Sequence, residues 1–215
     1  MKFLFILSLV LGLFSCKNNA SKGYEEINGY VLVEAEDYVS QELDSIRQWY
    51  TLDLMDSVLN IEGFIENHAQ EAGHQTYLKL LPDTRRTHDD ELVAGVSFSN
   101  KAGELAVLNY EVKFNTLGRY YVWVRAYSTG AEDNGIHVGI DGQWPESGQR
   151  MQWCKGKNQW TWESKQRTQE VHCGEPELIY LDIETTGMHT ISFSMREDGF
   201  EFDAFALSLQ YEKPE

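Results

Sequence analysis

The sequence predicts an all-β fold, an antiparallel β-sandwich. One reason is that segments rich in β-branched and aromatic residues recur along the chain, with turn-forming residues between them. A second reason is that few segments have the spacing of an amphipathic helix. The third is size, because 215 residues with 42% hydrophobic residues suffice for one globular core and favour one domain over two.

The predicted strands are recognised by different local patterns. Residues 30–36 form a hydrophobic run with an acidic end, and residues 136–140 alternate before the turn Asp141-Gly142. A turn at residues 115–118 separates two long runs that are dense in β-branched and aromatic residues. The full set of predicted strands is 30–36, 105–114, 119–127, 136–140, 160–164, 178–183, 189–195 and 200–209.

One segment has mixed signals. In residues 53–72, four apolar residues recur at helical spacing, but Gly63 interrupts them. A short helix and an ordered loop both remain open for this segment.

The N-terminal segment has the features of a targeting signal. Residues 3–14 are apolar or small, which is too short to span a bilayer as a helix and fits a secretory signal. The run ends in Leu13-Phe14-Ser15-Cys16, which resembles a bacterial lipobox; an ordinary signal peptide with an incidental cysteine is the alternative. We therefore expect a signal peptide over 1–15, a lipid on Cys16, a tether over 16–23 and one domain over 24–215. Lys17, by the same resemblance, favours the outer membrane of a Gram-negative bacterium, with either the periplasmic or the external face open.

Two further cysteines, Cys154 and Cys173, follow in the expected domain. An oxidising compartment makes a disulfide between them the default expectation. A zinc site that includes His172 is the alternative, but the paired short spacings of structural zinc motifs are missing.

The net charge narrows the range of partners. The chain has 18 Lys and Arg against 34 Asp and Glu, a formal charge of −16. Such a surface repels phosphate backbones and anionic lipids, so we expect no nucleic acid and no membrane contact except through the lipid anchor. The sequence also lacks a glycine-rich phosphate loop, a nucleophile elbow and a zinc-hydrolase helix.

Three motifs together resemble the carbohydrate-binding modules of families 6 and 35. They are Val33-Glu34-Ala35-Glu36-Asp37-Tyr38, residues 117–125 (LGRYYVWVR), and residues 187–191 (GMHTI) followed by 199–205 (GFEFDAF). The resemblance covers most of the domain but is weak over residues 41–103. It implies a jelly-roll sandwich of the galactose-binding-like type that binds polysaccharide or oligosaccharide.

The resemblance also implies a structural calcium ion held by Glu34, Glu36 and Asp203 with backbone carbonyls. Calcium prefers six to eight oxygen ligands, and carboxylates gathered from both ends of the chain repel one another unless a cation lies between them. Glu34 and Glu36 are two residues apart, so on a strand they share one face. A pair of solvated carboxylates on an edge strand is the alternative.

Sugar-binding residues are expected mainly between residues 128 and 173. Flat aromatic rings cover the C–H face of a sugar, and polar side chains bind its hydroxyls. A strand tryptophan is also a common core residue, so each aromatic candidate has that alternative. The candidates are the rings of Trp153, Trp160 and Trp162, with the polar side chains of Asp133, Asn134, Arg150, Arg196 and Asp198.

One position departs from the resemblance. Members of these families often carry an Asn two residues before the last-strand Asp, where it binds the sugar, but this chain has Glu201 there. A carboxylate repels acidic sugars, whereas Arg150, Arg167 and Arg196 would attract a carboxylate or sulfate group. The charge and the identity of the sugar therefore stay open, as does the oligomeric state.

We expect a binding protein and not an enzyme, one that acts beside glycan-degrading enzymes in polysaccharide utilisation. A small jelly-roll lyase, with His137, Arg125 and Tyr127 as base, neutraliser and acid, is one alternative. A glycoside hydrolase with two carboxylates across a cleft is another. A protein-interaction surface module is the third.

Overall fold

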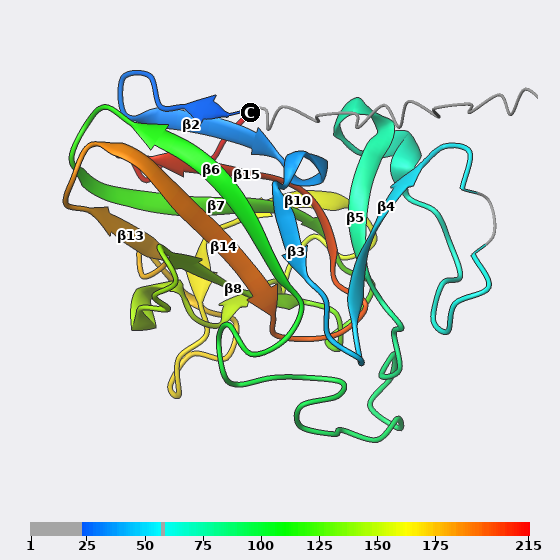
Figure 1. Cartoon of the computed structure of the whole chain (residues 1–215). Coiled ribbons are helices and arrows are strands. Elements are labelled where there is room, and N and C mark those ends of the chain that lie inside the picture. The colour runs from blue at the N-terminus through cyan, green and yellow to red at the C-terminus, as the bar shows by residue number, and fades with distance from the viewer. Residues whose placement is uncertain (1–22, 57–58) are drawn as a thin grey trace, which may run out of the picture.

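Two β-sheets pack face to face in the computed structural model of the chain, which describes residues 23–56 and 59–215 (Figure 1). The all-β prediction is confirmed, because the only helices in these residues are short 3-10 turns. None of the helices in this part of the chain has the length and apolar character needed to cross a membrane. The predicted signal peptide, Cys16 and most of the tether lie outside the described residues.

The first sheet has eight strands in the described residues, in the order β1-β6-β14-β8-β9-β11-β12, with β3 also paired to β6. Long neighbouring strands form its centre, as β14 pairs antiparallel with both β6 and β8. Its strands are β1 (Tyr24–Glu25), β3 (Ser40–Glu42), β6 (Val107–Phe114), β8 (Gly135–Ile140), β9 (Met151–Gln152), β11 (Lys165–Gln166), β12 (Glu175–Pro176) and β14 (Gly187–Met195).

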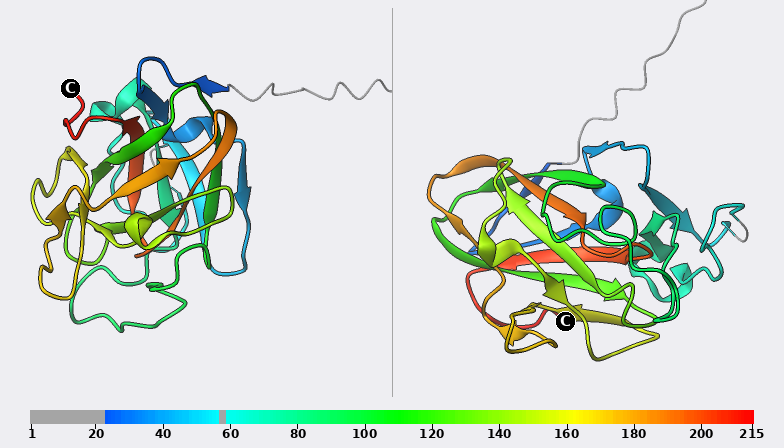
Figure 2. Two further views of the ribbon diagram at one scale, coloured as in Figure 1. Left: turned by 90° about the vertical axis from the view of Figure 1, so that its left-hand side faces the viewer. Right: turned by 90° about the horizontal axis from the view of Figure 1, so that it is seen from below.

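The second sheet has seven strands in the same part of the chain, in the order β10-β7-β15-β5-β4. Strand β13 also pairs with β7, and β2 pairs with β15. Its strands are β2 (Tyr30–Glu34), β4 (Gln48–Asp53), β5 (Thr76–Leu81), β7 (Gly118–Tyr127), β10 (Trp160–Glu163), β13 (Tyr180–Ile183) and β15 (Glu201–Ser208). Figure 2 shows the same strands from two further sides.

The core lies between the sheets and is rich in aromatic rings. The ring of Phe193 on the first sheet lies 4.9 Å, centroid to centroid, from both Phe202 and Phe205 on the second. Tyr110 adds an edge contact to Phe205 at 4.9 Å. Full burial of each such side chain contributes about 1.5–3 kcal/mol, so these contacts join the two layers strongly.

A β-bulge at Asp203 explains how Phe202 and Phe205 both reach this core. Side chains on a regular strand alternate, so residues three apart face opposite sides. The register of β15 against β7 shifts between Phe202 and Ala204, which leaves Asp203 as the extra residue. The bulge thus turns both phenylalanines inward and leaves the Asp203 carboxylate near the side chain of Arg125.

A second, smaller apolar cluster lies on the outer face of the second sheet. Leu52, Tyr77 and Trp160 pack there with two alanines from the chain between β4 and β5, Ala69 and Ala72. The described residues of the segment 53–72 contain a single 3-10 turn, η2 (Ala69–Glu71), so the ordered-loop alternative holds. This loop covers part of the outer face and gives the sheet a second layer of packing.

The expectation that Glu34 and Glu36 share one strand face is wrong. Strand β2 ends at Glu34, and the 3-10 turn η1 (Ala35–Asp37) follows. Ala35 is fully buried in the core, and the hydroxyl of Tyr110 donates to its carbonyl at 2.8 Å. That anchor favours the turn over a longer strand.

The predicted disulfide is present, joining Cys154 to Cys173 with their Cα atoms 5.4 Å apart. It closes a loop that contains strands β10 and β11. A loop of this length corresponds to about 3 kcal/mol of stabilisation in the chain-entropy model.

Candidate functional site

A row of side chains crosses the outer face of the second sheet. Trp160 is the register partner of Tyr127, Tyr127 of Glu201, and Glu201 of Lys79. Directly opposite residues on antiparallel strands point to the same side of a sheet. These four side chains therefore form one line across strands β10, β7, β15 and β5.

Glu201 is the centre of a buried charge network in this row. Its Oε1 lies 2.7 Å from Lys79 Nζ, and its Oε2 lies 2.7 Å from His68 Nδ1. Its side chain is only 2% exposed. Burial lowers the pKa of His68, but the hydrogen bond and charge of Glu201 raise it by more. The Glu201 carboxylate is thus committed to organising two side chains and does not face solvent.

The aromatic part of the row is held by His68. Its ring stacks on Tyr127 with 3.8 Å between ring centroids, and Trp160 Nε1 donates to the His68 carbonyl at 3.1 Å. The rings of Tyr127 and Trp160 are 5.5 Å apart in an edge contact. A pocket of about 250 Å³ opens here, lined by His68, Tyr127, Trp160 and Asn158 among others. We call these rings the aromatic wall.

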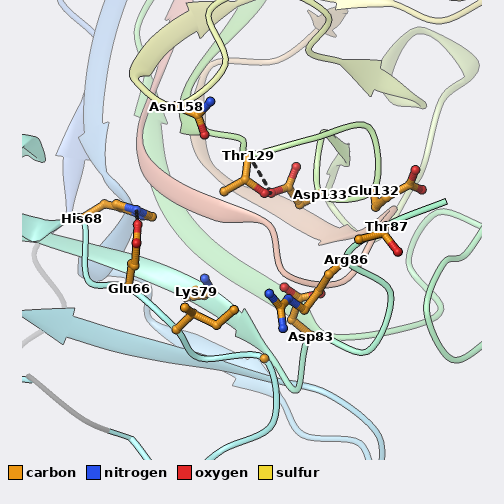
Figure 3. A pocket seen from close by; sticks show the side chains of 12 residues that line it. Glu66, His68, Lys79, Asp83, Arg86, Thr87, Thr129, Glu132, Asp133 and Asn158 are labelled. Carbon is orange, nitrogen blue, oxygen red and sulfur yellow. Dashed lines mark hydrogen bonds and ion pairs between the residues drawn. The ribbon is translucent and has the colours of Figure 1, made fainter. Parts of the chain in front are cut away.

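A second pocket, the polar pocket, adjoins the aromatic wall (Figure 3). It shares the lining residues His68 and Asn158 with the pocket at the wall. Its volume is about 300 Å³. Lys79 lines it from β5, and the loops after β5 and β7 supply further lining residues. Its polar lining includes Glu66, His68, Lys79, Asp83, Arg86, Thr87, Thr129, Glu132, Asp133 and Asn158.

Asp133 shapes the rim of the polar pocket. Its carboxylate accepts hydrogen bonds from the hydroxyls of Ser128 and Thr129, each at 2.7 Å, and from the amide of Thr129 at 2.8 Å. The Thr129 bond is drawn in Figure 3. The loop that joins β7 to β8 is therefore closed on itself around this carboxylate.

Asp83 is the pocket residue with the most altered acidity. Burial, and next the negative charge of Asp198, raise its pKa to about 7. One of its oxygens, Oδ1, is buried and has no hydrogen-bond partner among the described residues. Near neutral pH this group is therefore poised between its acid and its carboxylate forms.

A third pocket, the arginine pocket, lies beside the polar pocket and shares Glu132 with it. Its volume is about 700 Å³. Four of its lining residues are arginines: Arg85, Arg150, Arg167 and Arg196.

The three predicted metal residues lie near one another beside the aromatic wall, because Asp203 pairs with Arg125, whose guanidinium lies 5.7 Å from the centre of the Trp160 ring. One oxygen each from Glu34, Glu36 and a ring nitrogen of His74 lie within 4.8 Å of one another. A Cβ at Gly73 would lie 3.1 Å from Glu34 Oε2 and 3.3 Å from Asp203 Oδ1. Asp203 pairs with Arg125 and accepts the Gly73 amide at 2.7 Å, so part of its charge is already neutralised.

Burial, together with the charges of Glu34, Asp37 and Asp203, raises the pKa of Glu36 to about 7 despite a bond to its own backbone amide. Its Oε2 is a buried oxygen without a hydrogen-bond partner in the described part of the chain. Glu34 and Glu36 thus offer oxygens suited to a hard cation, and His74 offers nitrogen on the exposed side.

Four predicted sugar-binding residues line the pockets. Asp133 lies in the polar pocket, and Trp160 lies in the aromatic wall although its side chain is largely buried. Arg150 and Arg196 line the arginine pocket.

The other four candidates lie elsewhere. Trp153 is 1% exposed and packs on Phe200 in the core, the alternative stated for each tryptophan. Asn134 is buried and donates to the Trp153 carbonyl at 2.6 Å. Asp198 is buried behind the polar pocket, paired with Arg47 at 2.7 Å. Trp162 is half-buried on β10 and lines none of these three pockets.

Most of the pocket lining comes from the region where the sequence resemblance is weak. His68, Lys79, Asp83 and Arg85 all lie between residues 41 and 103. The one local sequence feature that could have indicated a binding site in this region is the cationic run at residues 84–88 (TRRTH), in an otherwise acidic chain. The structure disfavours His137 as the base of a lyase, because the side chain is fully buried and burial lowers its pKa to about 4.

The chain is similar in sequence to an uncharacterized protein from Formosa agariphila. The two are 58% identical over 187 residues, which are 86% of this chain and 45% of that protein. The chain therefore spans less than half the length of this relative. No protein-family model matches the sequence.

Solved structures with a similar fold include carbohydrate-binding modules. A family 35 module from Clostridium thermocellum is 12% identical, with a TM-score of 0.44 over 83% of this chain and 96% of the module. The C-terminal family 6 module of a marine laminarinase from Zobellia galactanivorans is 13% identical, with a TM-score of 0.44 over 83% of this chain and 98% of the module.

Proposed function

We propose that this domain binds carbohydrate without cleaving it, at the polar pocket and the adjoining aromatic wall. The observation that carries the proposal is their juxtaposition, with Tyr127 and Trp160 beside a pocket lined by amide, hydroxyl, ammonium and carboxylate groups. Sugar recognition uses this combination, because rings cover C–H faces while polar groups bind hydroxyls.

The state of the carboxylates favours binding over hydrolysis. Glu132 pairs with Arg85 and with His88, Asp133 accepts bonds from its own loop, and Glu201 is held by Lys79 and His68. A general base needs a carboxylate that is free to take a proton from water. These three carboxylates already serve as fixed acceptors.

A glycoside hydrolase is the second candidate, and Asp83 is the observation that favours it. A carboxyl group with a pKa near 7 in a pocket is suited to donate a proton to a leaving group. The two functions are separated by the release of new reducing ends from a bound polysaccharide.

We also propose that Glu34 and Glu36 hold a calcium ion, with Asp203 beside them. The buried, unpartnered Glu36 Oε2 supports this, because a cation would satisfy it. When bound, the ion would neutralise the repulsion between the carboxylates. The remaining charge on Asp203 is balanced by Arg125.

The lipid on Cys16 and the outer-membrane location stay proposals. A tether over residues 16–23 would hold the domain near the membrane, where it would present glycans to degrading enzymes.

The experiment is a glycan array probed with the chain, followed by calorimetric titration of each glycan that binds. Asn158→Gly removes a pocket amide, and Gly tolerates the positive φ of 58° at this position. Asn28→Gly is the matched control, since Asn28 is exposed, has a φ of 54° and lines none of the three pockets.

We expect Asn158→Gly to bind the glycan at least tenfold more weakly than the wild type. The control Asn28→Gly should bind it with unchanged affinity. An array with no binding glycan would overturn the proposal, and protein partners would then be the next candidates.

A further inference from the structure

Positive charge in this acidic protein is concentrated in the arginine pocket. Its four arginines come from four separate segments: Arg85 follows β5, Arg150 precedes β9, Arg167 follows β11 and Arg196 follows β14. The whole chain has only 18 Lys and Arg against 34 Asp and Glu. Bringing four guanidinium groups to one pocket costs electrostatic repulsion, which an anion would offset.

The guanidinium groups have spare donors inside the protein. The Nε–H groups of Arg85, Arg150 and Arg196 are buried and lack a hydrogen-bond partner within the described residues. The Arg196 side chain is only 8% exposed. A buried charged donor without a partner is costly to the fold, so an acceptor beside it is favoured.

The carboxylates of the pocket do not cancel this charge. Glu132 pairs with Arg85, and Glu197 lies 3.4 Å from Arg196 while it also accepts the Asn134 amide at 2.9 Å. In residues 23–56 and 59–215, no carboxylate lies within ion-pair distance of Arg167. Arg150 pairs with Glu146, which lies outside the pocket lining, so Arg167 is the one arginine of the four without a carboxylate partner among the described residues.

Electrostatic effects on neighbouring groups agree with this arrangement. The charge of Arg167, then burial and the charge of Arg196, lower the pKa of His172. Burial and the charges of Arg167 and Arg150 lower the pKa of Arg196, against the opposing effect of Glu197. Three of the guanidinium groups therefore act on the same small volume.

We infer that the arginine pocket binds an oxyanion carried by the glycan, either a carboxylate or a sulfate ester. The inference rests on the proposed carbohydrate binding and names its ligand class, an acidic polysaccharide. Guanidinium groups bind both oxyanions through paired N–H donors. Because Glu132 lines both pockets, a sugar in the polar pocket lies next to the arginines.

The first test uses inorganic sulfate as the probe and melting temperature as the readout. Sodium sulfate is compared with sodium chloride at equal ionic strength, for the wild-type chain, Arg167→Gln and Lys213→Gln. Lys213 is exposed, lines none of the three pockets and gives the same change of charge. Sulfate stabilises proteins in general, so the specific effect is the difference between variants.

We expect the extra stabilisation by sulfate to be lost in Arg167→Gln, partly restored in Arg167→Lys and kept in Lys213→Gln. Equal responses in all four proteins would mean a general salt effect and would overturn the anion site. This test needs no glycan, so its outcome is independent of the proposed function.

The second test identifies the anion with matched polysaccharides. A sulfated polysaccharide is compared with its desulfated form, and polygalacturonate with its methyl ester, by calorimetric titration. We expect at least tenfold tighter binding of one charged form, and at least a tenfold loss of that preference in Arg167→Gln. Equal affinity for charged and uncharged forms would overturn the inference while leaving carbohydrate binding intact.

Discussion

Lys79 and Glu201 are 122 residues apart in the sequence and form a buried ion pair with an Nζ–Oε1 distance of 2.7 Å. They are register partners on β5 and β15. The same carboxylate holds His68 against Tyr127 in the aromatic wall. The acidic residue at position 201 is therefore explained by its partners Lys79 and His68, which both line the polar pocket.

Glu201→Gln should destabilise the domain strongly, because it leaves Lys79 buried without a counter-charge. The expected loss in the free energy of unfolding is about 3–5 kcal/mol, measured by urea denaturation. Glu104→Gln, which breaks the exposed pair with Lys101, is the control and should change the stability far less, because exposed ion pairs contribute little. The pKa of His68, followed by NMR, should also fall. A stability loss no larger than the control's would contradict the role given to Glu201.

This pair also shows the limit of sequence-based prediction. Strands with regular alternation, such as β6 and β7, were predicted correctly from local patterns. Strands β4 and β5 were missed. In β5 the sequence Thr-Tyr-Leu-Lys-Leu-Leu places a lysine in the middle of a buried strand, and the partner that permits its burial lies on β15.

The pocket residues were also only partly predictable, because some of them come together through contacts that local sequence patterns do not show. Arg150 and Arg196 were predicted as binding residues, but Arg85 joins them from a loop without periodicity. Asp133 was predicted on the same grounds as Asn134, yet Asn134 bonds the Trp153 carbonyl inside the fold. The two neighbours differ in role because the Asp133 carboxylate accepts hydrogen bonds from its own loop at the pocket, whereas the Asn134 amide bonds a core carbonyl.

Asp83 should make stability depend on pH. Its pKa is raised from the ordinary value to about 7, so the folded state binds this proton more tightly than the unfolded state. The resulting stabilisation is complete below about pH 4 and is lost as the pH rises through about 7. Asp83→Asn cannot titrate and so does not lose stability in this way. The melting temperature of the variant minus that of the wild type should therefore be larger at pH 8 than at pH 5.

Asp89→Asn, an exposed change on the same loop, serves as the control for Asp83. It should shift the melting temperature equally at both pH values. The same shift for Asp83→Asn at pH 5 and pH 8 would rule out the proposed titration.

Trp153 and Trp160 should behave differently when truncated. Trp153→Ala removes a ring from the centre of the core and should cost about 3–5 kcal/mol in the free energy of unfolding. Trp160→Ala should lower glycan affinity at least tenfold, about 1.4 kcal/mol, because this ring lines the aromatic wall. Calorimetric titration of the folded fraction, with urea denaturation for stability, measures both. Unchanged affinity in folded Trp160→Ala would move the sugar platform elsewhere, with Trp162 as the next variant.

Calcium should stabilise the folded domain by mass action, since only the folded chain brings His74 and Asp203 to Glu34 and Glu36. Chelator should lower the melting temperature of the wild type, and added calcium should restore it. Glu36→Gln should no longer respond, whereas Glu62→Gln, an exposed carboxylate outside the cluster, should respond like wild type. Identical melting curves with and without chelator in the wild type would exclude the ion.

Binding without cleavage is tested most directly by a calorimetric titration of the chain with a polysaccharide that binds on the array. Reducing ends and unsaturated sugar products are then assayed in the same cell. We predict saturable binding that Asn158→Gly weakens at least tenfold, with no new reducing ends and no unsaturated products. New reducing ends that disappear in Asp83→Asn would contradict the account and identify the polar pocket as a hydrolase site.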